Sequence, residues 1–81
     1  MEKSIYTREY AVILRMLKEA RESAGITQVQ LANKLKLSQS FVTKMERGDR
    51  RIDVVQLRTI CRIYGITLVE FVRQMEKELG K

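Results

Sequence analysis

Helix start and stop signals recur at short intervals along this chain, and they constrain its fold more than any other feature. The spacing of a capping box, in which Thr or Asp is followed three residues later by Gln or Glu, occurs at Thr27, Asp53 and Thr67. Ser38 is a further N-cap residue, and the glycines expected to end helices in a left-handed conformation are Gly25, Gly48 and Gly65. With a first helix from about Thr7 to Ser23, these signals predict five helices and no strand, which is an all-α fold.

Apolar residues spaced three or four positions apart predict which face of each helix is buried. Along the five expected helices these residues are Tyr10, Ile13, Leu14, Leu17, Ala20 and Ala24; Leu31, Ala32 and Leu35; Val42 and Met45; Leu57, Ile60, Cys61 and Tyr64; and Leu68, Phe71, Val72, Met75 and Leu79. The lone cysteine, Cys61, lies on such a face, so we expect it to be a small core residue. We expect residues 1–81 to form one small domain around this core.

The charge of the chain is concentrated in its middle third. The net charge is +6, and residues 34–62 carry eight basic and three acidic side chains, whereas residues 1–33 carry five and four. A polyanionic partner is the natural inference, with a solvated basic face as the alternative. The charged N-terminus is unlike a signal peptide, no apolar run is long enough to span a membrane, and one cysteine cannot form an internal disulfide. We therefore expect a soluble cytoplasmic protein.

Residues 25–51 combine two of the predicted helices with a tight turn between them and a basic loop after them. This is the organisation of a helix-turn-helix, in which the second helix offers polar side chains to base edges in the major groove of DNA. Since Val42 and Met45 must face the core, the outward residues of that helix are Gln39, Ser40, Thr43 and Lys44. Gln suits adenine, Lys suits guanine, and Ser or Thr serves several bases. The segment from Ser38 to Lys44 contains no acidic residue, as expected for a surface that approaches phosphates.

Other residues of this region suit the DNA backbone rather than the bases. Gln28 stands in the first turn of its helix, where unpaired backbone amides can bind a phosphate oxygen; an ordinary polar residue is the alternative. Arg47, Arg50 and Arg51 place three guanidinium groups beside the end of the next helix, which suits phosphate binding, with a solvated basic turn as the alternative. Phe41 either packs against the preceding helix or lies along the sugar-phosphate chain, and we favour packing.

Three segments together carry a resemblance to a known family. They are Thr-Gln-x-x-Leu-Ala at 27–32, Ser-Gln-Ser-x-Val-x-Lys-x-Glu-Arg-Gly at 38–48, and the helix that contains Leu57 and Ile60. The combination resembles the Cro and phage-repressor type of helix-turn-helix protein, also called the xenobiotic-response-element family. The resemblance covers about residues 9–72. It implies a five-helix, lambda-repressor-like domain that binds double-stranded operator DNA, usually as a two-fold dimer.

The resemblance also implies roles for individual residues. Gln28 would contact phosphate and brace Gln39. Arg47 and the loop after it would hold the DNA backbone, and Gln39, Ser40 and Lys44 would read bases. Together with the outward residues of the helix that follows Ser38, the full set of residues expected to contact DNA is Gln28, Ser38, Gln39, Ser40, Thr43, Lys44, Arg47, Arg50 and Arg51.

Two further positions matter for the scaffold of the motif. Arg21 and Glu46 occupy the places of a family ion pair that locks the recognition helix to the first helix. The sequence departs from the family at Lys36, where glycine is common. We therefore expect either a different turn or a left-handed conformation of Lys36, which carries a cost for a residue with a side chain.

The fifth predicted helix, at about residues 68–79, has no expected role in reading DNA. The residues expected at a dimer interface are Phe71, Val72, Met75 and Leu79, of which Met75 and Leu79 would be exposed on a monomer. The alternative is simple packing on the first helix. A dimer would hold two recognition helices about 34 Å apart, the length of one turn of DNA.

The sequence leaves several regulatory functions open and gives no support to catalysis. No histidine is present and the carboxylates are scattered, so we expect no enzyme activity, metal, cofactor or small-molecule ligand. The leading interpretation is a sequence-specific transcriptional regulator, a repressor that binds a pseudo-palindromic operator as a homodimer. The alternatives are an antitoxin whose fifth helix grips a toxin, a controller protein of a restriction-modification operon, and a coactivator that uses the fold only for protein contacts. The acid-free surface argues against the last.

Overall fold

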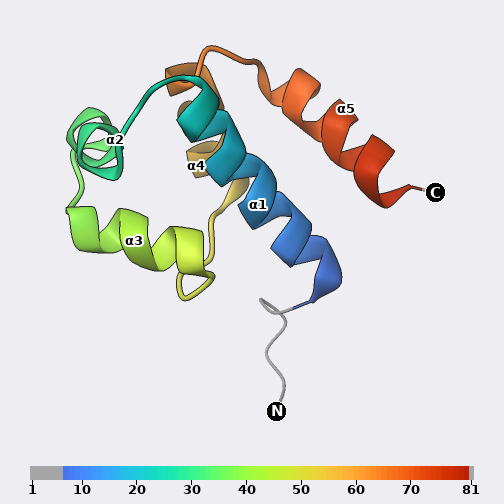
Figure 1. Cartoon of the computed structure of the whole chain (residues 1–81), viewed down its shortest axis with the longest axis horizontal. Coiled ribbons are helices and arrows are strands. Elements are labelled where there is room, and N and C mark those ends of the chain that lie inside the picture. Colours follow the sequence, from blue (N-terminus) through green and yellow to red (C-terminus); the bar gives the residue numbers. More distant parts are fainter. Residues whose placement is uncertain (1–6, 81) are drawn as a thin grey trace.

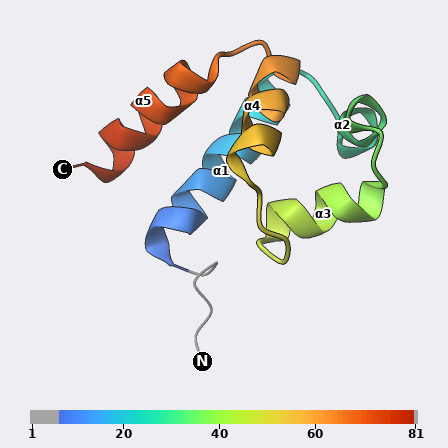
Figure 2. The same ribbon diagram turned by 180° about the vertical axis from the view of Figure 1, so that it is seen from behind.

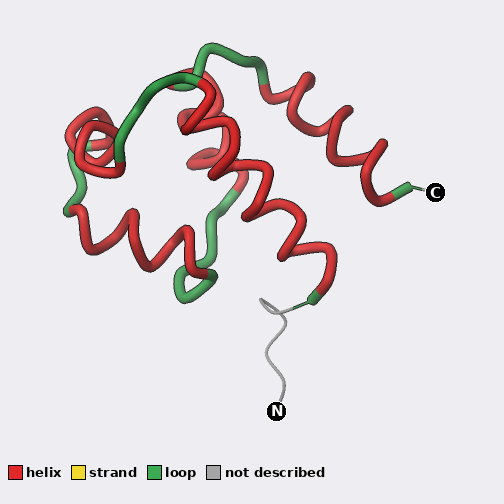
Figure 3. Tube along the Cα trace, in the orientation of Figure 1, coloured by secondary structure: helices red, strands yellow, loops and turns green. Residues whose placement is uncertain are grey.

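The computed structural model describes residues 7–80, and this part of the chain contains five α-helices and no strand, which confirms the predicted fold class. The helices are α1 (Arg8–Ser23), α2 (Gln28–Leu35), α3 (Gln39–Arg47), α4 (Val54–Ile63) and α5 (Leu68–Leu79). In Figure 1, α1 runs through the middle of the molecule, with α2 and α3 on one side of it and α5 on the other. Figure 2 shows the molecule from behind, where α4 overlaps α1 in the view, and Figure 3 shows that short loops join the helices.

Every predicted helix start is confirmed. Thr27, Asp53 and Thr67 each form a complete capping box, in which the N-cap side chain accepts from a backbone amide and the Gln or Glu side chain accepts in return. Ser38 caps α3 by accepting a hydrogen bond from the Phe41 amide at 3.1 Å. The predicted glycine stops are also confirmed, since Gly25, Gly48 and Gly65 all have positive φ. Each cap satisfies backbone groups that a helix end leaves without partners, so these local signals fix where the helices begin and end.

Of the two alternatives at Lys36, a different turn or a left-handed residue, the structure has the left-handed residue. Its φ is 61° and its ψ is 39°, and it is the one residue other than glycine with positive φ in the described part of the chain. The Leu37 amide donates to the Ala32 carbonyl at 3.0 Å, which closes the turn after α2. The tight turn between α2 and α3 is therefore kept at the cost of a strained lysine.

The core lies where the five helices pack together. Its buried apolar side chains are Met16, Leu17, Leu31, Ala32, Val42, Met45, Ile60, Cys61, Tyr64 and Phe71. All of these except Met16 were predicted from helical spacing. The predicted stripe on α1 is wrong at Ala24, which is the exposed C-cap of that helix. Because α1 contacts both α3 and α5, it buries a wider surface than one stripe, and Met16 and Arg21 are part of it.

Helix α5 differs from the prediction in which residues it leaves in solvent. Met75 packs against the core and Leu79 is half-buried, so the expectation that both are exposed is wrong. Helix α5 packs on α1 and α4, which covers these residues, and Arg15 of α1 pairs with Glu78 of α5 at the surface. The exposed apolar side chains of α5 are instead Val69, 61% exposed, and Val72, 36% exposed.

None of the five described helices is long and apolar enough to cross a membrane.

Candidate nucleic-acid interface

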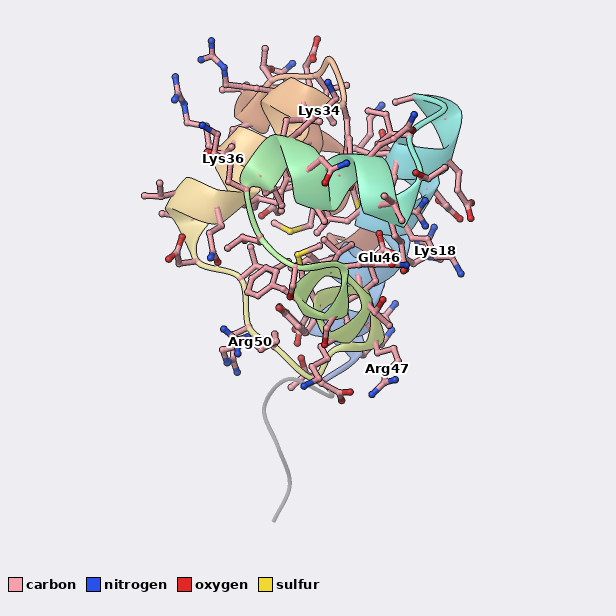
Figure 4. The ribbon with its side chains drawn as sticks, turned by 90° about the vertical axis from the view of Figure 1, so that its left-hand side faces the viewer. Lys18, Lys34, Lys36, Glu46, Arg47 and Arg50 are labelled. Atoms are coloured by element: carbon pink, nitrogen blue, oxygen red, sulfur yellow. The ribbon has the colours of Figure 1, made fainter. Side chains whose placement is uncertain are left out.

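Helices α2 and α3 form a compact pair that presents the first two turns of α3 to solvent. Leu31 and Ala32 of α2 and Val42 and Met45 of α3 are buried in the common core, which leaves the opposite side of α3 outward. Figure 4 looks along α3, with α2 above it and with Arg47 and Arg50 on the side of α3 away from α2. The exposed residues of this outward side are Ser38, Gln39, Ser40 and Lys44.

Arg21 and Glu46 form a buried ion pair between the end of α1 and the end of α3. Arg21 Nε donates to Glu46 Oε2 at 2.7 Å, and Arg21 Nη2 donates to Glu46 Oε1 at 3.1 Å. The two side chains are 10% and 5% exposed. Arg21 also donates to the Ile26 carbonyl at 2.9 Å, and its hydrogen bond to Glu46 raises the pKa of Arg21 above its ordinary value. This bidentate pair fixes α3 against α1 and the α1–α2 loop.

Gln28 joins the same network from α2. Its Nε2 donates to Glu46 Oε1 at 3.0 Å, and its Oε1 accepts a hydrogen bond from the Thr43 hydroxyl at 2.9 Å. The resemblance implied that Gln28 braces Gln39; in the structure its two side-chain partners are Glu46 and Thr43. Thr43 is accordingly half-buried rather than fully outward like Gln39 and Lys44. No sequence signal distinguishes these partners, because Gln39 and Thr43 both lie on the side of α3 that faces away from the core.

The basic loop after α3 contains an internal ion pair. Arg47 Nη2 lies 2.6 Å from Asp49 Oδ2, and the Arg47 side chain is still 64% exposed. Arg50 lies over the ring of Phe41, with its guanidinium carbon 4.8 Å from the ring centroid. Phe41 itself is half-buried against the core, in line with the packing that we favoured. An arginine held on an aromatic face keeps its charge while losing part of its freedom, so Arg50 stays beside the first turns of α3.

Arg51 lies over an aromatic ring in a similar way, that of Tyr10, which the sequence analysis assigned only to the buried stripe of the first helix. Its guanidinium carbon lies 5.5 Å from the ring centroid of Tyr10, and the Tyr10 hydroxyl accepts a hydrogen bond from the Ile52 amide at 3.2 Å. Tyr10 thus joins the loop to α1 through contacts between residues about forty positions apart in the sequence, which local patterns cannot reveal.

Tyr64 and Cys61 lie in the core near the network. Burial raises the pKa of the Cys61 thiol to about 11, and burial followed by the nearby Glu46 charge raises the pKa of the Tyr64 hydroxyl. The Tyr64 hydroxyl has no hydrogen-bond partner among residues 7–80. Neither group is placed to meet DNA, and the described residues contain no cluster of side chains that could hold a metal ion.

The chain is similar to several known proteins. Residues 17–71 match the sequence model of the helix-turn-helix family. The control protein C.MunI from Mycoplasma sp is 30% identical over 64 residues, which is 79% of this chain and 86% of that protein. An XRE-family like protein from Pseudomonas syringae pv. tomato has a solved structure that is 39% identical with a TM-score of 0.82, covering 88% of this chain and 87% of that chain.

A second solved structure, a mutant of the restriction-modification controller protein C.Esp1396I, is 27% identical with a TM-score of 0.78 and covers 100% of this chain and 98% of that chain. The family predicted from the three sequence segments is thereby confirmed. This chain belongs to the helix-turn-helix family of the Cro and phage-repressor type, a family of DNA-binding regulators.

Proposed function

We propose that this chain is a sequence-specific repressor that binds a pseudo-palindromic operator as a homodimer in the cytoplasm. The observation that carries this proposal is the outward side of α3, where Gln39, Ser40 and Lys44 are exposed and no acidic side chain lies among them. In this proposal these residues read base edges in the major groove. Arg47, Arg50 and Arg51 hold phosphates on the flanking backbone.

The exposed face of α5 supports the dimer. Val69 and Val72 line a shallow apolar hollow together with Leu68, Arg73 and Glu76. In Figure 1 this helix lies on the far side of α1 from α3, so pairing through α5 leaves both recognition helices free. Two copies related by a two-fold axis read two half-sites one turn apart, about 34 Å. Of the residues first expected at the interface, Val72 fits this surface best, and Phe71 is buried in the core.

A second candidate is control of a restriction-modification operon. It is favoured by the names of two similar proteins, the control protein C.MunI and the restriction-modification controller protein C.Esp1396I. In that case this chain would bind the promoter of its own operon. Specific binding of that promoter, with neighbouring endonuclease and methyltransferase reading frames, supports this candidate over a general repressor.

The test of the proposed function is selection of duplexes from a random library, followed by binding measurements at several salt concentrations. We expect a pseudo-palindromic consensus and an affinity that falls steeply with salt. Gln39→Ala should relax selectivity at one base position by about 1–3 kcal/mol. Arg50→Ala should weaken all duplexes alike and lower the salt slope by about 1. An enriched pool without a consensus refutes the proposal.

The dimer is tested by sedimentation equilibrium, which measures the molecular mass of the species in solution. Val72→Asp should shift the chain toward monomer because it puts a charge into the apolar hollow of α5. Val29→Asp is the matched control, since Val29 is a 48% exposed valine on α2, away from α5. Equal effects of the two substitutions contradict the proposed interface.

A further inference from the structure

We propose that Thr43 meets DNA only as a hydrogen-bond acceptor, and so selects a base that carries an exocyclic amino group in the major groove, adenine through N6 or cytosine through N4. This inference rests on the proposed function, because it adds Thr43 to the residues proposed to read bases and names the chemistry that it recognises. It follows from the direction of the hydrogen bonds in the network of Arg21, Glu46, Gln28 and Thr43.

The direction of these bonds is settled by Glu46. Both of its carboxylate oxygens accept from Arg21, at 2.7 and 3.1 Å, and a carboxylate has only acceptors to offer. The group of Gln28 that lies 3.0 Å from Glu46 Oε1 must therefore be its amide nitrogen, which donates. This fixes the orientation of the Gln28 carboxamide, and its oxygen is left facing Thr43.

The Thr43 hydroxyl must then donate. It lies 2.9 Å from Gln28 Oε1, an acceptor, and a threonine hydroxyl has a single hydrogen. Once that hydrogen points to Gln28, the remaining capacity of Thr43 is the lone pairs of its oxygen. A free threonine hydroxyl suits several bases because it can donate or accept, whereas this one is restricted to accepting.

In the major groove, a side chain that can only accept hydrogen bonds selects among the bases. Its hydrogen-bond donors are the N6 amino group of adenine and the N4 amino group of cytosine, while guanine O6 and N7 and thymine O4 are acceptors. Thr43 lies three residues from Ser40 and four from Arg47, so it shares their side of α3. Thr43 is half-buried at that place. Its hydroxyl oxygen favours a base that offers an amino hydrogen, because a base that offers only an acceptor would set its lone pairs against those of the hydroxyl.

The test uses the duplex selected by the full chain, with base analogues that lack one amino group: purine in place of adenine and 2-pyrimidinone in place of cytosine. At one position we expect loss of the amino group to weaken binding of the wild-type chain roughly three- to tenfold. Thr43→Val, which removes the hydroxyl and keeps the shape, should lose that discrimination. Thr43→Ser should keep it, and so should Gln39→Ala, the control from the neighbouring turn. Comparing variants on the same pair of duplexes cancels the effect of each analogue on the duplex itself.

A second variant separates this role from a structural one. Gln28→Leu removes the acceptor that holds the Thr43 hydrogen, so the hydroxyl becomes free to donate. We expect this variant to tolerate guanine or thymine at the Thr43 position at least threefold better than the wild-type chain does, relative to the selected base, whatever its overall affinity.

The outcomes are distinct. If Thr43→Val is as sensitive to the amino group as the wild-type chain, or if Thr43 instead discriminates in favour of guanine O6 or thymine O4, the inference is overturned while the proposed function stands. A chain that selects no consensus duplex at all refutes the proposed function, and the inference falls with it.

Discussion

Replacing Arg21 with methionine should be among the most destabilising changes of a single charged residue in this protein. The substitution leaves the Glu46 carboxylate, 5% exposed, without its two hydrogen bonds from Arg21. It also takes away the donor to the Ile26 carbonyl, although methionine keeps most of the packing volume. Breaking one side of a buried pair costs about 3–5 kcal/mol. A domain of this size has a total stability of about 4–12 kcal/mol, so Arg21→Met should leave the fold marginal.

The assay is urea and thermal unfolding followed by far-ultraviolet circular dichroism. A loss of this size lowers Tm by roughly 12 °C or more in a small domain. Arg15→Met is the control, because Arg15 makes its ion pairs with Glu19 and Glu78 at the surface, where screening by solvent makes the expected loss much smaller. The double variant Arg21→Met/Glu46→Leu should recover part of the loss, since no buried charge remains. A loss below about 1 kcal/mol for Arg21→Met refutes the reasoning, as does a double variant less stable than the sum of its single changes.

Three further changes test other features. Tyr64→Phe should raise the unfolding free energy by up to about 1 kcal/mol, because it removes a buried hydroxyl that has no partner among residues 7–80; a lower urea midpoint contradicts this. Lys36→Gly should raise Tm by a few degrees by relieving the left-handed strain at φ 61°, and a lower Tm shows that strain is not the dominant effect. Burial raises the pKa of the Cys61 thiol to about 11, against an ordinary 9.0. Between these two pH values the unfolded chain loses the thiol proton while the folded chain keeps it. The unfolding free energy is therefore unaffected below pH 9 and falls by up to about 1.4 kcal/mol per pH unit as the pH rises toward 11. Stability measured between pH 8 and 11 should fall less steeply for Cys61→Ala, and equal slopes rule out the thiol as the cause.

The fold could be predicted from the sequence because its determining signals are local. A capping box needs residues three apart, and a glycine stop needs one residue, so both can be seen without tertiary contacts. At Lys36 the sequence left two alternatives, a different turn or a left-handed residue, and the structure decides for the second. The pattern failed at Ala24, which lies past the last turn of α1 as its C-cap, and it missed Met16, because the width of the buried surface on α1 depends on two helices that pack on it.

The candidate site was predictable only in part, because its finer contacts join distant segments. Helical spacing gave the outward residues of α3. It could not show that Thr43 bonds to Gln28, which is fifteen residues away, or that Arg51 lies over Tyr10. The sequence also failed to predict which apolar residues of α5 are exposed, for the same reason. Helix α5 packs on α1, with Arg15 paired to Glu78 sixty-three residues away, and this packing leaves Val69 and Val72 outward.

The buried network also decides which substitutions can separate binding from stability. Glu46 accepts hydrogen bonds from α1 and from α2 while it stands on α3, so any change there disturbs the scaffold and the reading surface together. Gln39 and Lys44 have no such link to the core, and changes there should alter recognition with little effect on unfolding. Thr43 lies between these classes, because its hydroxyl donates its single hydrogen to Gln28 in the buried network, while the lone pairs of the same oxygen are proposed to contact a base. A variant of Thr43 that changes base preference while keeping Tm would show that base recognition and stability can be changed separately at this one side chain.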